Sequence, residues 1–350
     1  MAGEISEAIK QMNAFVEKVD EPLKKSFQIM HQGYVHQNLE RFLRAREGNV
    51  AKANKMLLDC LYWRVQNEID NILAKPIQPR EVYNDVRESQ LIGMTGYCKK
   101  GRPVFAIGVG LSGYDKASPD KYVQSHIQMN EYRDQVLLPN STKKHGRYIG
   151  PCLKVLDMTG LKLSALSRIK ILTMISTIDD LNYPEKTETY YIVNAPYVFS
   201  ACWKVVKPLL QERTRRKIQV LQGCGRDELL KVMDYDVLPH FSRQEGSGSS
   251  RRNNDQMIDC FSPNHQFHLE LYDYIKQQAS IAKPVAPAKM GSFHVDVPEQ
   301  DDEGTVIIQT IETALHSMGN ESEVENGIAN LRVNGDQSLR LQTTGSRNED

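Results

Sequence analysis

The sequence lacks the features of secreted and membrane-spanning proteins. Its six cysteines are scattered and include no CxxC pair, so no disulfide framework is indicated. The N-terminus, MAGEISEAIKQ, carries charges where a signal peptide needs an apolar run. The stretch nearest to a membrane span, 190–203, contains Asn194 and Pro196 and is shorter than the about 20 residues that a spanning helix needs. We therefore expect a cytosolic chain with reduced thiols that visits membranes without crossing them.

Sequence support for catalysis or cofactor binding is also missing. No GxSxG nucleophile elbow is present. Residues 108–113 fit GxGxxG, but the helix that should start at the last glycine is delayed to Ser118, so we interpret the motif as a strand-exit loop rather than a dinucleotide site. The pair His265 and His268 has no Cys or carboxylate at zinc-finger spacing and is interpreted as a solvated helix start. We expect no catalytic residue, no metal and no cofactor.

Acidic residues could in principle form a catalytic site. Asp157 and the pair Asp179-Asp180 are candidates for paired acids. Asp157 lies in LDMTG, which is typical of a strand ending in a turn, and the other two fall at an expected helix end. We interpret Asp157 as a turn residue and Asp179 and Asp180 as solvating the helix end, and we expect the protein not to be an enzyme.

The net charge is zero, with 44 basic and 44 acidic residues, but it is unevenly distributed. Residues 296–350 hold twelve acidic residues and three arginines, a net charge of −9, which leaves +9 on the rest. This pattern predicts a basic body and an acidic tail. Nucleic-acid binding is disfavoured because aromatic residues do not interleave with the main basic group. A solvated face and attraction to anionic membranes both stay open for this group, which comprises Lys204, Lys207, Arg213, Arg215, Arg216 and Lys217.

Periodicity divides the chain into three regions. Residues 1–75 are predicted to be helical, and prolines at 76 and 79 mark a linker. From residue 80 strands alternate with helices, which predicts an α/β domain over 80–243, with a mixed or parallel sheet covered by helices. Residues 244–350 are predicted to be a linker and a partly disordered acidic tail, containing helices at Phe267–Gln278 and Thr305–Met318. The expected strands are Val104–Ile107, Leu153–Asp157, Thr189–Val193 and Ile218–Leu221.

The most informative stretch is 182–221. Glu185, Thr214 and Lys217 stand where its secondary structure elements break. A carboxylate, a hydroxyl and an ammonium beside an apolar helix suit a ligand that is oily at one end and a hydroxylated phosphate at the other. The helix, Pro196–Leu210, is apolar on much more than one stripe. It is either a core helix or a lid between a lipid cavity and a bilayer.

The same stretch resembles a known family. Tyr183-Pro184-Glu185, the run Ile192–Pro196 (IVNAP) and Lys207-Pro208 occur in the order found in CRAL-TRIO lipid-binding proteins, in the plant and fungal branch that transfers phosphatidylinositol. The resemblance extends from about Leu39 to Phe241. It implies an N-terminal helical subdomain followed by an α/β domain whose sheet and helices enclose a lipid cavity.

The resemblance also implies site residues. Glu185 would accept hydrogen bonds from inositol hydroxyls, Thr214 and Lys217 would donate to the phosphate, and Arg46 would lie near the same headgroup. The branch's phosphatidylcholine site uses four hydroxyl side chains that this sequence lacks, so we expect weak or absent phosphatidylcholine transfer. The matching positions hold Met94, Phe105, Cys152 and Lys154.

The expected function is therefore to bind phosphatidylinositol in a hydrophobic cavity and to transfer or present it between membranes or to lipid kinases. The expected partners are this phospholipid and, transiently, an anionic membrane surface, but not nucleic acid. The expected location is the cytoplasm and the periphery of membranes, with Golgi and plasma membrane as candidates. Two alternatives stay open: a carrier of another hydrophobic ligand such as a sterol, and a membrane-tethered regulatory module.

Overall fold

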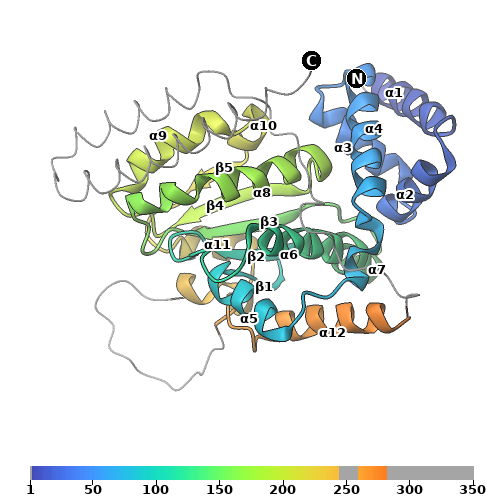
Figure 1. Cartoon of the computed structure of the whole chain (residues 1–350). Helices are drawn as coiled ribbons and strands as arrows, with labels where there is room; N and C mark the ends of the chain where they lie inside the picture. The colour runs from blue at the N-terminus through green and yellow to red at the C-terminus, as the bar shows by residue number, and fades with distance from the viewer. Residues whose placement is uncertain (1, 244–258, 282–350) are drawn as a thin grey trace, which may run out of the picture.

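A five-stranded mixed sheet forms the centre of the molecule, whose computed structural model describes residues 2–243 and 259–281. The strands lie side by side in chain order. β1 is antiparallel to β2, and every later neighbour is parallel (Figure 1). The predicted α/β class and mixed sheet are thus confirmed. The strands are β1 (Ile92–Tyr97), β2 (Pro103–Gly108), β3 (Cys152–Asp157), β4 (Thr187–Val193) and β5 (Ile218–Val220).

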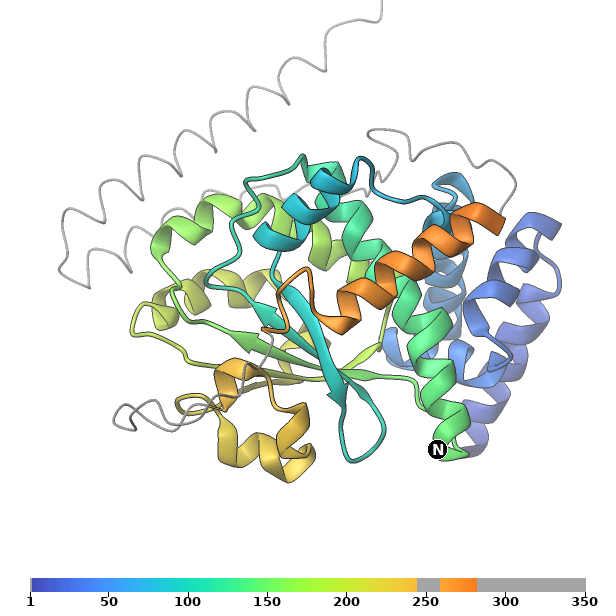
Figure 2. The same ribbon diagram turned by 90° about the horizontal axis from the view of Figure 1, so that it is seen from below.

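Helices cover both faces of this sheet (Figure 2). α6 (Pro119–Tyr132), α8 (Ile169–Asn182) and α12 (Gln266–Ile281) bury apolar side chains on one face. α11 (Arg226–Val232) packs Leu229 on the other. Because both faces are covered, β2 and β3 are almost entirely buried. This explains why their sequences are near-continuous apolar runs.

The first strand was not among the expected strands, because glycines interrupt its pattern. Gly93 and Gly96 lie within β1, and glycine is depleted in strands. Gly93 is required by a close approach, since a Cβ built there would lie 2.0 Å from the carbonyl oxygen of Cys260. A segment remote in sequence thus rests directly on β1.

The helix expected from Ser118 to about Leu138 runs further. α6 continues through a π-helical turn, η2 (Arg133–Leu137), into α7 (Leu138–His145). Such π turns often occur at functional sites. The remaining elements are η1 (Ile69–Ala74), α5 (Arg80–Ser89), η3 (Leu163–Arg168), α9 (Phe199–Leu209), α10 (Glu212–Arg215), η4 (Tyr235–Val237) and η5 (His240–Ser242).

The N-terminal region is helical, as predicted, and has a hydrophobic core of its own. Its helices bury residues between Ile9 and Leu61 against one another. They lie beside the sheet (Figure 1), and α4 leads directly toward η1 and the sheet domain. The helices are α1 (Ala2–Val16), α2 (Glu21–His31), α3 (Val35–Ala45) and α4 (Val50–Gln66).

The helix predicted at Phe267–Gln278 is confirmed as α12, but it is part of the folded body. Phe267, Leu271 and Ile275 are buried in the same core as the sheet residues. Their spacing of four residues places them on one face of α12, which has to be buried. Residues 259–281 therefore pack on the domain, unlike the separate tail that we expected from residue 244 onward. The linker at 244–258 and the predicted helix Thr305–Met318 lie outside the described residues.

Within 2–243 and 259–281, no helix combines the length and the apolar character that a membrane span requires.

Candidate functional site

The turns that carry the predicted site residues meet because β4 and β5 are parallel neighbours. Glu185 lies in the turn between α8 and β4, and Lys217 lies between α10 and β5. The amide of Tyr190 donates to the carbonyl oxygen of Lys217 at 2.9 Å, at the start of the β4–β5 pairing. The amino-terminal ends of both strands therefore lie at one edge of the sheet, which brings the two turns together.

Glu185 and Lys217 form an ion pair at this edge. Lys217 Nζ donates to Glu185 Oε2 at 2.7 Å, and the two side chains are 24% and 19% exposed. Glu185 has a positive φ of 61°, an uncommon backbone conformation for a residue other than glycine and one worth relating to function. The pair is thus held by the fold and can still be reached from solvent.

Thr214 lies beside this pair, on α10. Its hydroxyl donates to Asp180 Oδ1 at a long 3.4 Å. Arg213, also on α10, donates to the backbone oxygens of Asp180 at 2.8 Å and Ala45 at 3.0 Å. Arg213 therefore joins the end of α8, the end of α3 and α10, and so positions Thr214.

Arg46, the fourth predicted residue, is not brought into the same cluster. It ends α3, and its Nη1 donates to the carbonyl oxygen of Ala45 at 3.1 Å. Burial and the nearby Arg213 lower the pKa of Arg46. Arg46 lines neither of the cavities that Glu185 and Lys217 line. A role for Arg46 at the headgroup stays a prediction.

Two cavities meet at Glu185 and Lys217. The larger, of about 400 Å³, lies between α3, the 147–151 loop and the 185–188 turn. The smaller, of about 30 Å³, extends toward Thr214 and Asp179. Cations outnumber carboxylates around the larger cavity, six to three, which favours an anionic ligand. The cations are Arg41, Arg44, Arg102, Arg147, Lys186 and Lys217, and the carboxylates are Glu40, Glu185 and Glu188.

Two arginines at these cavities have buried donor atoms without a partner. Nε of Arg41 and Nη2 of Arg133 are buried, and no hydrogen-bond partner for either is found among the described residues. Arg41 lines the larger cavity and Arg133 the smaller one. An unsatisfied buried donor costs about 1–3 kcal/mol. Sequence reasoning did not identify either residue, because each lies within a long helix and only the fold aims it at the cavity.

A buried polar frame supports the turn that carries Glu185. Tyr183 donates its hydroxyl to Glu131 Oε1 at 2.6 Å, and Lys186 pairs with Asp134 at 3.1 Å. Burial lowers the pKa of Lys186 to about 8, although Asp134 partly offsets this effect. Burial also acts to raise the pKa of Asp134, but Arg133 and Lys186 outweigh it and hold that pKa below its usual range. Both residues that flank Pro184-Glu185 are therefore anchored to the α6–η2 helix.

The positions that lack the expected hydroxyls are neighbours on one face of the sheet. Met94 pairs with Phe105, and Phe105 pairs with Lys154. Met94, Phe105 and Cys152 belong to the hydrophobic core. The fold thus gathers these positions, and three of them carry side chains suited to packing. A cavity of only about 30 Å³ remains beside Phe105 and Lys154.

Lys154 takes part in a network that corrects the interpretation of Asp179. Lys154 Nζ donates to Asp179 Oδ2 at 3.2 Å, and His126 Nε2 lies 2.7 Å from Asp179 Oδ1. Burial opposes ionisation of Asp179, but His126 and Lys154 outweigh it and hold the pKa of Asp179 well below its usual range. Asp179 therefore faces the interior instead of solvating the helix end, because α8 turns this residue toward α6 and β3.

Of the remaining motifs, the structure confirms the interpretation of two and contradicts that of one. Asp157 ends β3, and its Oδ1 accepts from the amide of Thr159 at 3.1 Å, as expected for a turn. Gly108 ends β2, and residues 109–113 form the loop that follows it, as interpreted. The solvated interpretation of His268 was wrong: this residue is 1% exposed, its Nε2 lies 3.2 Å from the carbonyl oxygen of Cys260, and burial lowers its pKa to about 3.

Comparison with known proteins gives matches along most of the folded region. The family model of the CRAL/TRIO domain matches residues 87–242, and that of the CRAL/TRIO N-terminal domain matches residues 8–59. The phosphatidylinositol/phosphatidylcholine transfer protein SFH12 of Arabidopsis thaliana is 29% identical over 244 residues, which are 67% of this chain and 44% of that protein. The SEC14 cytosolic factor of Eremothecium gossypii is 29% identical over 57% of this chain and 66% of its own length.

The match to longer relatives is partial. The chain spans between 35% and 56% of the length of four Arabidopsis thaliana transfer proteins, including SFH12. Among solved structures, the crystal structure of Sfh5 superposes with a TM-score of 0.56 at 18% identity. The superposition covers 80% of this chain and 98% of Sfh5, and it shows that the two chains share a fold.

Proposed function

The chain belongs to the CRAL-TRIO family, and from this premise we propose that it binds phosphatidylinositol and transfers it between membranes or presents it to other proteins. The observation that carries the proposal is the Glu185–Lys217 pair, which lies where a cationic cavity of about 400 Å³ meets a smaller cavity beside Thr214. The names of similar proteins, which describe phosphatidylinositol and phosphatidylcholine transfer, support this choice of ligand.

The proposed headgroup contacts follow from the chemistry of each side chain. Glu185 accepts hydrogen bonds from inositol hydroxyls, while Lys217 and Thr214 donate to the phosphate. The unpartnered Nε of Arg41 and Nη2 of Arg133 offer further donors to an anion. Hydrogen bonds between charged groups and phosphate are about twice as strong as neutral ones. The headgroup therefore replaces part of the Glu185–Lys217 interaction and leaves both side chains with a hydrogen-bond partner.

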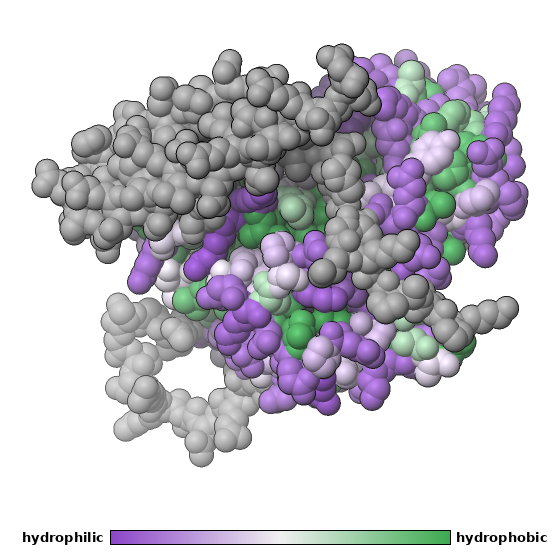
Figure 3. Space-filling model, in the orientation of Figure 1, coloured by the Kyte–Doolittle hydropathy of each residue, from purple (hydrophilic) through white to green (hydrophobic). Residues whose placement is uncertain are grey.

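The acyl chains require an apolar space that opens on loading. The small cavity beside Phe105 cannot hold an acyl chain, since its volume is about 30 Å³. Each buried methylene is worth about 0.8 kcal/mol, so two chains cross water only when covered. Side chains of α8 such as Ile171, Leu172 and Ile175 are only partly buried, and apolar residues reach the surface near the middle of this face (Figure 3). We propose that α8 and α9 separate from the sheet during loading, as a hinged gate.

The proposed membrane contact lies around α9. Tyr197, just before this helix, is 84% exposed, and Lys204 and Lys207 on α9 are exposed. Aromatic residues favour the membrane interface, and each cation near an anionic surface contributes about 1 kcal/mol. The proposed location is therefore the cytoplasm, with peripheral attachment to anionic membranes. The proposal requires no covalent step, so we propose a carrier rather than an enzyme.

Vesicle-to-vesicle transfer of phosphatidylinositol tests the headgroup contacts. Lys217→Ala should abolish transfer and leave the fold intact. Lys231→Ala is the matched control, because Lys231 also pairs with a glutamate, Glu228, but lies on α11 and is 66% exposed. Unchanged transfer by Lys217→Ala, or equal loss in both variants, would overturn the proposed site.

The same assay, run with phosphatidylcholine, tests selectivity. We expect phosphatidylcholine transfer to be weak, because Met94, Phe105, Cys152 and Lys154 provide no hydroxyl at that face of the sheet. Equal rates for the two lipids would contradict this. Mass spectrometry of lipid that co-purifies with the protein distinguishes the alternatives: a sterol would indicate a different cargo, and the absence of any lipid would favour a regulatory module.

A further inference from the structure

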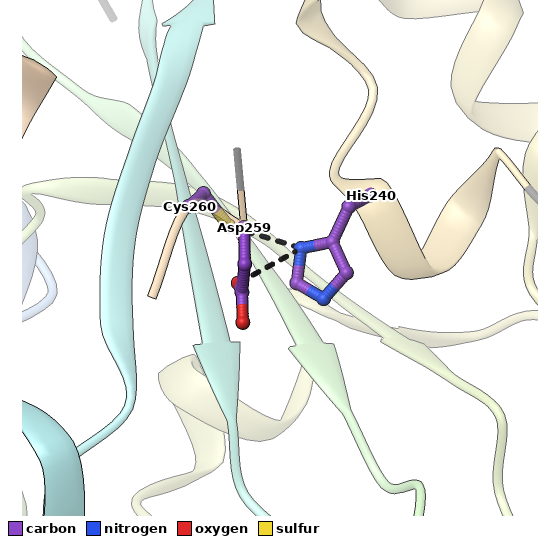
Figure 4. A group of neighbouring side chains, drawn as sticks. All are labelled: His240, Asp259 and Cys260. Atoms are coloured by element: carbon purple, nitrogen blue, oxygen red, sulfur yellow. Dashed lines mark hydrogen bonds and ion pairs between the residues drawn. The ribbon is translucent and has the colours of Figure 1, made fainter. Parts of the chain in front are cut away.

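Three metal-ligating side chains converge at the point where the segment 259–281 joins the sheet domain. His240 lies on η5, and Asp259 and Cys260 begin the returning segment (Figure 4). His240 Nδ1 lies 3.2 Å from Asp259 Oδ1 and 3.5 Å from Cys260 Sγ. The three donor atoms all lie within 4.8 Å of one another.

The two separations from His240 Nδ1 match the edges of a tetrahedral zinc site. With bonds of about 2.0 Å to nitrogen and oxygen and about 2.3 Å to sulfur, tetrahedral ligands lie about 3.3 Å apart for N···O and about 3.5 Å for N···S. Hydrogen bonding alone satisfies the cluster poorly, because the single Nδ1 faces both an oxygen and a sulfur and carries at most one hydrogen. A cation between the three atoms interacts with all of them at once.

The surrounding structure holds these ligands in place. Cys260 is 3% exposed, and its carbonyl oxygen lies 3.2 Å from His268 Nε2. The ring of His240 packs edge-on against Phe241 and Phe261, with centroids 5.1 and 5.2 Å away. Asp259 Oδ1 accepts from the amide of Phe261 at 2.8 Å, the kind of outer contact that orients a ligating carboxylate. The side chain of Asp259 is 53% exposed, so its carboxylate can rotate to complete the geometry.

We propose that His240, Asp259 and Cys260 bind one Zn²⁺ ion, with solvent at the fourth position. A mixed sulfur, nitrogen and oxygen set suits Zn²⁺ better than Mg²⁺ or Ca²⁺, which prefer oxygen alone. A thiolate and a carboxylate also neutralise the charge of the ion. The expectation of no metal considered only His265 and His268, since 18 residues separate His240 from Asp259 and no zinc-finger spacing connects them.

Zinc at this place fastens the returning segment to the domain. Cys260 lies directly over Gly93 of β1, and α12 follows a few residues later and packs Phe267 and Leu271 into the core. A metal bond at 259–260 therefore stabilises the docked position of α12. His240, Asp259 and Cys260 line neither cavity at Glu185, so this proposal is independent of the proposed lipid site.

Metal titration of the full chain, after removal of bound metal with a chelator, tests the site. Calorimetry with Zn²⁺ should give one site per chain, and Co²⁺ should give a thiolate-to-cobalt charge-transfer band. Cys260→Ser should abolish this band and weaken Zn²⁺ binding at least tenfold, and His240→Gln should weaken Zn²⁺ binding to a similar degree. Cys224→Ser is the control, because Cys224 is a cysteine of intermediate burial that lies outside the cluster.

Thermal unfolding provides the second readout. Zn²⁺ should raise the unfolding temperature of the wild type and of Cys224→Ser, but not that of Cys260→Ser. If a variant fails to fold, the cobalt spectrum of the wild type still tests thiolate ligation. The proposal is overturned if the wild type binds no zinc, if its cobalt complex lacks the thiolate band, or if folded Cys260→Ser binds zinc as tightly as the wild type.

Discussion

Tyr183 donates its hydroxyl to Glu131, and this bond connects the turn before Glu185 to the N-terminal helices. Glu131 Oε1 lies 2.6 Å from the tyrosine oxygen and 2.7 Å from Arg64 Nη1, and Arg64 lies on α4. Burial acts to raise the pKa of Glu131, but Arg64 outweighs it, so the pKa lies below its usual value. Burial and the adjacent Glu131 raise the pKa of Tyr183. The carboxylate thus stays charged between a tyrosine and an arginine.

Substitutions of Tyr183 and Glu131 should lower the free energy of unfolding by different amounts. Tyr183→Phe removes one hydrogen bond and should lower the free energy of unfolding by about 1 kcal/mol. Glu131→Ala leaves Arg64 buried with Asp70 alone, and should cost about 3–5 kcal/mol. Urea unfolding measures both. Tyr62→Phe, at an α4 position that is 44% exposed, should change stability by less than about 0.5 kcal/mol. Equal effects of the two tyrosine variants would mean that the Tyr183–Glu131 bond does not contribute.

The loss of folding stability at acidic pH should depend on His268. Burial, with smaller effects of Arg87 and His265, lowers the pKa of His268 to about 3 from 6.5. Between these values the unfolded chain binds the proton and the folded chain does not, so stability falls as the pH drops below about 6.5. The slope from this group is at most about 1.4 kcal/mol per pH unit.

Urea unfolding between pH 6.5 and 4.5 measures that slope. His268→Gln should flatten it, whereas His36→Gln, at an exposed position of α3, should leave it unchanged. An unchanged slope in His268→Gln would show that this histidine does not carry the acid sensitivity.

Truncation should separate the docked segment from the residues beyond it. A chain ending at residue 243 loses Phe267, Leu271 and Ile275 from the core and should be less stable by about 5 kcal/mol or more. A chain ending at residue 281 keeps α12 and should unfold like the full chain. As a point test, Leu271→Asp should destabilise strongly, and Leu269→Asp should not, because Leu269 is 40% exposed. Equal stability of the two truncated chains would contradict the packing of α12.

The acidic segment 296–350 should weaken adhesion to anionic membranes. Its net charge of −9 competes with the membrane for the exposed cations of α9, such as Lys204 and Lys207. A chain ending at residue 295 should therefore bind anionic vesicles more strongly at low salt in a sedimentation assay. The difference should shrink at physiological ionic strength, where exposed charges are screened over about 8 Å. Weaker adhesion of the shortened chain would mean that the segment itself contacts the membrane.

Local patterns in the sequence predicted most of the secondary structure elements and one pair of site residues, Glu185 and Lys217. Apolar runs are sufficient to locate β2 and β3, because both strands are almost entirely buried and such strands are mostly apolar. The family motif placed Glu185 and Lys217 in the turns before two strands, and parallel pairing of β4 with β5 then brought them to 2.7 Å. The same reasoning missed β1, since its glycines reflect a contact with Cys260 that is remote in sequence.

The sequence by itself determined the elements whose signal is local: helices with one apolar face, buried strands, and a motif of contiguous residues. Only the tertiary structure decided which polar residues turn inward to partners in the fold. Asp179 and His268 were predicted to be solvated, yet each faces the interior, where Lys154 and the carbonyl oxygen of Cys260 respectively provide its partner. The physical reason is that the burial of a polar group depends on partners far away in the chain. The convergence of His240 on Asp259 and Cys260 likewise required the fold, because nothing local in the chain links η5 to the segment that returns across β1.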